Sequence, residues 1–257
     1  PHSDHEWVER ELTRVWETVA FLGSVSPWSF PEIPDCLPLL ERLAVEGSVL
    51  NGAELHAVGV SLASGGLLTE ALDVASSEGG WPGAEALAFI RNRLHTDGDL
   101  QRRIARTTDS AGQILDTASS ELRRIRARLR GARNKIVRKL EAFVVDLPER
   151  VRVPDASVGV REGRYVVPVR REGRRDVGGI VHDESHTGAT LFVEPPMAIE
   201  LTNELRGLEK EETREIHHIL TEITQTLRPL HPSLTASWEA LVEFDSLCAR
   251  ARASNDW

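Results

Sequence analysis

Basic side chains are concentrated in one part of the chain, where their type and spacing fit contact with a polyanion. Residues 123–139 hold nine Lys and Arg within 17 positions and no acidic residue. Six more arginines follow between 161 and 175, opposed in that stretch only by Glu162 and Glu172. Arginine binds phosphate through two parallel hydrogen bonds, and such contacts follow a nucleic-acid backbone without reading its bases. The candidate nucleic-acid-binding residues are Arg128, Arg133, Lys135, Arg161, Arg164, Arg170, Arg171, Arg174 and Arg175.

Each basic group also has a simpler interpretation. The cations of 123–139 can form a solvated helix face that pairs with acids on a second helix, where Glu204, Glu209, Glu211, Glu212 and Glu215 are available. The arginines of 161–175 can instead protect the edge strands of a sheet from pairing with other chains. The sequence leaves both alternatives open.

Two other patterns resemble catalytic or metal sites. His182–His186 gathers metal-type ligands within five residues, but it has no third partner at a recognised spacing and lies at a turn before Gly188. This favours turn architecture with some ligand contact over a metal or hydrolytic site. His217-His218, preceded by Glu215, lacks the spacing of a zinc protease. Neither glycine-rich nucleotide-binding motif is present, so we expect no catalytic residue, metal or cofactor in this chain.

The total charge of the chain conceals a strong asymmetry. The chain has 257 residues, 31 Lys and Arg, 40 Asp and Glu, and a formal net charge of −9. Residues 1–120 carry −10, residues 121–176 carry +9 and residues 177–257 carry −8. A local basic zone attracts a polyanion whatever the total charge, so −9 does not exclude a nucleic-acid partner.

Composition also bears on the compartment. Cys36 and Cys248 lie far apart, so we expect neither a metal knot nor a disulfide framework, and a reducing cytoplasm fits best. We find no apolar run near the roughly 18 residues of a spanning helix and no secretion signal, so no membrane contact is expected. The chain begins at Pro1 within a helical pattern, which indicates a segment of a longer protein.

The periodicity of the apolar residues places these groups on structural elements. A helix is predicted over 4–22, with Trp7 and Leu12 on its apolar stripe and Asp4 or Ser3 as its cap, and the Pro27–Pro38 stretch ends it. Helices follow at 38–46, 52–77 and 83–95, separated at Gly47, Gly52, Gly79–Gly80 and Pro82–Gly83, and then a loop or small hairpin at 107–118.

The spacing of apolar residues changes twice in the second half of the chain, from helix to strands and back to helix. A long helix with a coiled-coil stripe is predicted from Ser120 to Leu147. Short strands at 158–161, 165–170, 179–182 and 190–194, separated by turns that include Glu172-Gly173, predict a small antiparallel sheet. A second long helix runs to Leu227, with Glu212 at a wet or bent point of its stripe, and a last helix covers 233–253.

The predicted fold is therefore mainly α, with a helical core and a long antiparallel two-helix stalk that carries a small inserted β clamp. The predicted parts are a helical core at 1–119, a first lever helix at 120–148, a β-rich clamp-like insertion at 149–195, a second lever helix at 196–228 and a return to the core at 229–257.

Several strings of this sequence resemble the bacterial MutS type 2 family. They are 179–195 (GIVHDESHTGATLFVEP), 200–205 (ELTNEL), 163–170 (GRYVVPVR), the turn of 109–120 and 46–50 (EGSVL). They occur in order and at matching separations, and His186 departs from the small residue expected there.

The resemblance implies the core, lever and clamp regions of a homodimeric protein. An ATPase region that binds ATP and Mg, and an Smr-type nuclease region, would follow residue 257. It also implies engagement of branched or distorted DNA, suppression of homologous recombination and, in some bacteria, splitting of collided ribosomes through ribosomal RNA contact. A purely structural coiled-coil module is the remaining alternative.

Overall fold

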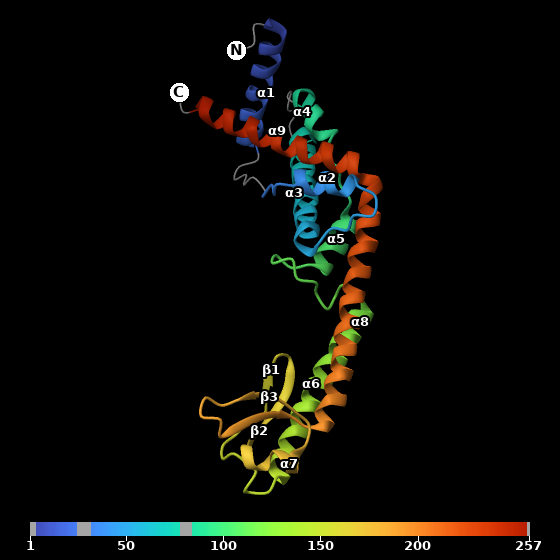
Figure 1. Cartoon of the computed structure of the whole chain (residues 1–257). Coiled ribbons are helices and arrows are strands. Elements are labelled where there is room, and N and C mark those ends of the chain that lie inside the picture. Colours follow the sequence, from blue (N-terminus) through green and yellow to red (C-terminus); the bar gives the residue numbers. More distant parts are fainter. Residues whose placement is uncertain (1–3, 25–31, 78–83, 256–257) are drawn as a thin grey trace. The chain divides into compact units, whose positions relative to one another are not determined.

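The computed structural model describes residues 4–24, 32–77 and 84–255 and is mainly helical (Figure 1). The expected breaks at Gly79–Gly80 and Pro82–Gly83, the Ser3 cap and much of the Pro27–Pro38 stretch lie outside these residues. The elements are α1 (His5–Ser24), α2 (Leu37–Ala44), α3 (Gly52–Ser77), α4 (Ala84–Arg91), α5 (Gly98–Thr107), α6 (Ser120–Asp146), β1 (Gly159–Arg161), β2 (Arg164–Arg170), η1 (Arg171–Gly173), α7 (Arg174–Val177), β3 (Ile180–Glu184), β4 (Thr190–Glu194), α8 (Pro196–Leu227), η2 (Arg228–Leu230) and α9 (His231–Asn255).

The chain divides into two compact units. The first unit comprises Pro1–Ala118 and His218–Trp257, and the second comprises Ser119–His217. The division into core, lever and clamp parts made from the sequence stays a prediction.

The core of the first unit lies where α1, α3, α4 and α9 pack together (Figure 1). Phe21 and Phe244 are fully buried there, with their rings edge to face and their centroids 5.6 Å apart. Asp4 caps α1 as predicted, because its carboxylate accepts a hydrogen bond from the Glu6 backbone N–H at 3.1 Å.

The apolar stripe predicted for α1 is wrong at its start. Trp7 is 38% exposed and Leu12 is 65% exposed. Leu12 lies nine residues before Phe21, which is two and a half turns of helix, so it points away from the side of α1 that Phe21 buries.

One helix corrects the expectation that no apolar run is long enough for a membrane span. Residues 52–75 of α3 pass that test by length and composition. The same segment carries Leu55, Leu62, Leu68 and Leu72 into the interior of the first unit, each at most 3% exposed. A core helix of a globular unit meets the same criterion, so the segment is weak support for a membrane contact.

Helix α5 is absent from the sequence prediction, because its composition is too polar for a clear stripe. The signal that marks it is its cap, since the Asp97 carboxylate accepts from the Leu100 N–H at 2.9 Å. After α5 the expected small hairpin is present, with a bridge between Thr108 and Ile114. A side chain at Gly52 would overlap the Gly112 carbonyl of this hairpin, so glycine is required where α3 begins.

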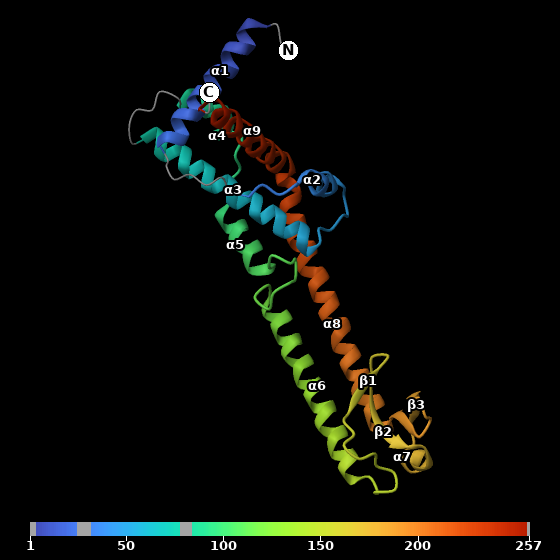
Figure 2. The ribbon, with the colours of Figure 1, turned by 90° about the vertical axis from the view of Figure 1, so that its left-hand side faces the viewer.

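The second unit joins α6 and α8 to a four-stranded antiparallel sheet in the order β1-β2-β4-β3 (Figures 1 and 2). Val169 pairs with Leu191 and Val167 with Val193, which sets the register of the two central strands. These four residues form one core with the inner faces of both helices. That core includes Ile125, Leu129, Ile136, Leu140, Leu201, Leu205 and Leu208.

Two details of the second unit differ from the prediction. The expected Glu172-Gly173 turn is part of η1 and leads into α7, because Gly173 packs against Val151 so closely that a side chain would overlap it. Glu212, predicted at a wet or bent point, lies within the continuous helix α8 and is not fully solvated. Its carboxylate is partly buried and accepts from Arg126 Nε at 2.6 Å.

Acid is expected to weaken the first unit through Glu11. Burial raises the pKa of this carboxyl, but hydrogen bonds from Arg250 and Arg14 outweigh burial and hold the pKa below its ordinary value. A carboxyl whose folded pKa is lowered stabilises the fold above its unfolded pKa, and this stabilisation is lost as the pH falls through the folded value. All six tryptophans belong to the first unit, so tryptophan fluorescence in urea follows this unit alone. Stability should fall below about pH 4.5, and less steeply in Glu11→Gln. The same acid dependence in Glu11→Gln and in the exposed control Glu41→Gln would contradict this prediction.

Candidate nucleic-acid interface

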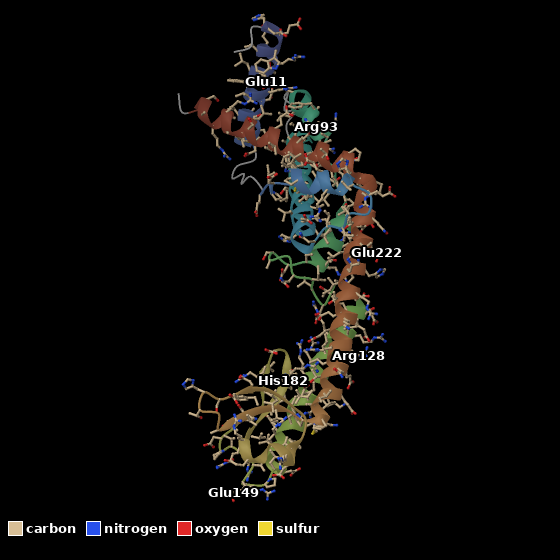
Figure 3. All side chains as sticks on the ribbon, viewed as in Figure 1. Glu11, Arg93, Arg128, Glu149, His182 and Glu222 are labelled. Atoms are coloured by element: carbon tan, nitrogen blue, oxygen red, sulfur yellow. The ribbon has the colours of Figure 1, made fainter. Side chains whose placement is uncertain are left out.

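The basic side chains of α6 meet acidic side chains of α8 in a row of ion pairs. Arg128, labelled in Figure 3, pairs with Glu211. From one pair to the next, the residue number rises along α6 and falls along α8, so the two helices are antiparallel in this region. The pairs are Arg126–Glu212 at 2.6 Å, Arg128–Glu211 at 3.0 Å, Arg133–Glu209 at 3.2 Å and Lys135–Glu204 at 3.8 Å.

These contacts place three of the predicted residues, Arg128, Arg133 and Lys135, in ion pairs with the neighbouring helix. Each of the three side chains is about half exposed, so each pair contributes on the order of 0–1 kcal/mol to stability. The guanidinium or ammonium groups therefore remain accessible, but their charge is offset by a carboxylate within 4 Å. The fifth acid, Glu215, accepts instead from the Ser119 hydroxyl at 2.7 Å, at the residue that caps α6.

Three arginines in and next to the sheet are also held within the unit. Arg161 pairs with Asp183 at 3.0 Å, and its guanidinium lies 4.4 Å from the centre of the Phe192 ring. Arg171 pairs with Glu184 and donates to the Gly188 carbonyl, which ties η1 to the turn after β3. These arginines connect strands and turns.

The third, Arg164, belongs to a buried polar cluster around Glu194. Glu194 is 1% exposed and accepts from Arg164 at 3.4 Å and contacts His182 Nε2 at 2.8 Å. His182, labelled in Figure 3, lies on β3 beside the carboxylate of β4. Among the described residues no group of three or more His, Cys, Asp or Glu could hold a metal ion. The arrangement links β2, β3 and β4 through the Glu194 carboxylate.

The remaining predicted residues are the most available cations of the sheet region. Arg170 is exposed and donates from Nε to the Arg152 carbonyl at 3.1 Å. Arg174 and Arg175 of α7 are exposed, and within the described ranges neither side chain has a hydrogen-bond or ion-pair partner. The structure therefore brings Arg170, Arg174 and Arg175 into neighbouring elements with their charges free of carboxylates.

The charge of each unit is sharper than the charge of the whole chain. The second unit holds 20 basic and 17 acidic residues, a net charge of +3, whereas the first holds 11 and 23, a net charge of −12. The +9 of residues 121–176 is thus mostly offset inside the unit by acids of β3, β4 and α8. Electrostatic attraction of a polyanion must come from the cations that these acids leave unpaired.

Sequence reasoning missed one group of such cations. Arg206, Lys210 and Arg214 lie on α8, which has more acids than bases and was treated as the acidic partner of α6. Their regular spacing of four residues is a signal in the sequence, because residues four apart share one face of a helix.

The two cysteines of the first unit are free and buried. Burial raises the pKa of Cys36 to about 11 and that of Cys248 to about 12, so both are protonated thiols at neutral pH.

The fold and this interface define a class of protein: a mainly helical chain with an inserted antiparallel sheet and arginines exposed on its surface. No family model matches the chain. The protein "Endonuclease MutS2" of Gemmatimonas aurantiaca is 40% identical over 98% of this chain, which covers 30% of that relative. The protein of the same name from Geobacillus thermodenitrificans is 35% identical over 98% of the chain and 32% of the relative. That of Pelotomaculum thermopropionicum is 38% identical over 83% of the chain and 26% of the relative.

The chain belongs to the MutS2 family, as the strings in its sequence predicted. It spans about 30% of the length of the curated relatives that it matches.

Proposed function

We propose that this chain is the non-catalytic core, lever and clamp segment of a MutS-like ATPase, that it engages branched or distorted DNA, and that it suppresses homologous recombination in this way. The observation that carries the proposal is the set of exposed arginines Arg170, Arg174 and Arg175, which no carboxylate neutralises, on a unit of positive net charge. Its relatives are named endonucleases, a class of enzymes that act on nucleic acid.

The antiparallel pair of α6 and α8 is suited to act as the lever. The ion pairs between the helices follow one antiparallel register, and a common apolar core ties both helices to the sheet. A movement of the helices is therefore passed to the arginines on η1, α7 and the end of β2. ATP and Mg would bind in an ATPase region outside these residues, and no cofactor would bind in the chain itself. Nucleotide can favour a closed clamp only by binding that state more tightly. We place the protein in the cytoplasm as a homodimer, without membrane contact.

A purely structural coiled-coil module is the second candidate, and a specific observation favours it. Four cations of α6 pair with acids of α8, as a structural pair of helices requires. This candidate predicts no polyanion binding even in low salt. Ribosomal RNA contact, for the splitting of collided ribosomes, uses the same phosphate chemistry and is tested by co-sedimentation with stalled disomes in preference to single ribosomes.

Replacement of Arg170, Arg174 and Arg175 together by alanine is expected to weaken DNA binding. Each lost phosphate contact reduces the magnitude of the negative slope of log K against log salt concentration by about 0.9, so this magnitude should fall by about 2 to 3. The measurement is fluorescence anisotropy with duplex and branched DNA across a salt series. Arg171 is left in place because its ion pair ties η1 to a turn. The control is Arg10→Ala/Arg102→Ala, two exposed arginines of the acidic first unit. An unchanged affinity and slope in the triple variant would refute the contact.

A further inference from the structure

The outer face of α8 carries a row of cations that no ion pair occupies. We propose that Arg206, Lys210 and Arg214 form a second phosphate-contacting surface and that its partner is the backbone of duplex DNA. The inference rests on the proposed function, because DNA binding as such comes from there, and it adds a surface distinct from α7 and its neighbours.

Helix geometry places the three residues on one side. Each step of four residues advances about 6 Å along the helix and turns only about 40° around it, so the side chains form a nearly straight row about 12 Å long. The buried residues Leu205 and Leu208 of the same helix lie on the opposite side. Asn203 and Thr213 share the outer side, and both are exposed and uncharged.

The acids of α8 do not cancel this row. Glu204, Glu209 and Glu211 lie to the flanks and are engaged by Lys135, Arg133 and Arg128 of α6. Arg206, Lys210 and Arg214 are exposed, and in the part of the chain that the structure describes none of them has a hydrogen-bond or ion-pair partner. These three acids are thus paired with cations of α6. A cationic outer face remains on a helix whose overall composition is acidic.

Gly207 is a second observation at the same place. A side chain at this position would meet nothing within 4 Å, so packing does not require glycine. Glycine inside a helix costs about 1 kcal/mol relative to alanine. It does leave the backbone open beside Arg206, and close approach of the backbone to a ligand is one of the uses of glycine. Arg206 also reaches the β1–β2 turn, since its Nη2 lies 4.0 Å from the position that a side chain at Gly163 would take.

A row of this spacing suits a nucleic-acid backbone better than a single anion. Duplex DNA carries a negative charge about every 1.7 Å along its axis, so a row of about 12 Å can meet several phosphates. Such contacts position the duplex without reading its sequence. The surface would therefore strengthen binding to any duplex, whether or not the duplex is branched.

The test compares the wild-type chain with Arg206→Ala/Lys210→Ala/Arg214→Ala in anisotropy titrations with a labelled duplex across a salt series. We expect the magnitude of the slope of log K against log salt concentration to fall by about 2 to 3 and the affinity to fall at least about tenfold in low salt. Arg206→Lys/Arg214→Lys, which keeps the charge, should bind like the wild type. All three residues are exposed, so circular dichroism should show an unchanged fold.

The outcomes separate this inference from the proposed function. If the wild type binds DNA, the Arg170, Arg174 and Arg175 variant loses affinity and the α8 variant does not, the inference is wrong and the proposed function stands. If the wild type fails to bind any DNA in low salt, the proposed function fails, and the inference fails with it. Displacement of the duplex by polyglutamate at equal charge concentration would show an acidic-protein surface and would also overturn the inference.

Discussion

Truncation of Leu140 to alanine is expected to lower the free energy of unfolding of the second unit by about 2–5 kcal/mol, the usual range for a fully buried leucine. Leu140 is fully buried where α6 meets both α8 and the sheet. The loss has two parts, the transfer of the deleted atoms to water and the cavity that rigid neighbours leave unfilled.

The composition of the chain makes this effect separable. Tryptophan fluorescence follows only the first unit, whereas circular dichroism at 222 nm follows the helices of both. Leu140→Ala should shift part of the circular dichroism transition in urea and leave the tryptophan transition in place. Val145→Ala on the same helix is the matched control, because Val145 is 68% exposed, and its effect should be within about 0.5 kcal/mol. A common shift of both transitions would show that the two units unfold together.

The long elements were predictable because their apolar periods extend over many helical turns, with one interruption at Glu212. The stripe from Leu122 to Leu147 and that from Leu201 to Leu227 set α6 and α8 to within a residue or two. Strands β1 to β4 were predicted by short β-branched runs between glycine turns. Helices α5 and α7 were missed, since one is too polar and the other too short to show a period.

The candidate interface was less predictable, and the reason is physical. Composition shows how many cations a segment holds, but the folded structure decides which carboxylate each of them meets. Arg128 and Arg174 are the same residue type in the same basic zone, yet one faces Glu211 across a helix pair and the other faces no carboxylate among the described residues. The sequence could only keep pairing and phosphate contact open as alternatives. For the same reason Arg206 was not predicted from the sequence. The residues near Arg206 in the sequence include several acids, whereas the face of the helix that carries Arg206 does not.

Glu194→Ala is expected to destabilise the sheet of the second unit by about 2–3 kcal/mol. Removal of one partner of a buried ion pair costs about 3–5 kcal/mol, because the other charge stays buried without compensation. The side chains of Arg164 and His182 are 23% and 17% exposed, so water compensates them in part and the expected cost lies at or just below the low end of this range. Hydrogen exchange of the β2 and β4 amides, read by mass spectrometry, would report the loss where it occurs.

Two further variants distinguish a buried charge cluster from a general weakening of the strand. Glu194→Gln keeps the shape and two hydrogen-bonding atoms, so it should cost less than Glu194→Ala. Glu184→Ala removes an exposed carboxylate from the neighbouring strand, and its pair with Arg171 is worth about 0–1 kcal/mol. Equal protection of the β2 and β4 amides in Glu194→Ala and Glu184→Ala would mean that the cluster around Glu194 does not hold the strands together. In that case the contact between His182 and Glu194 would not be explained by stabilisation of the sheet.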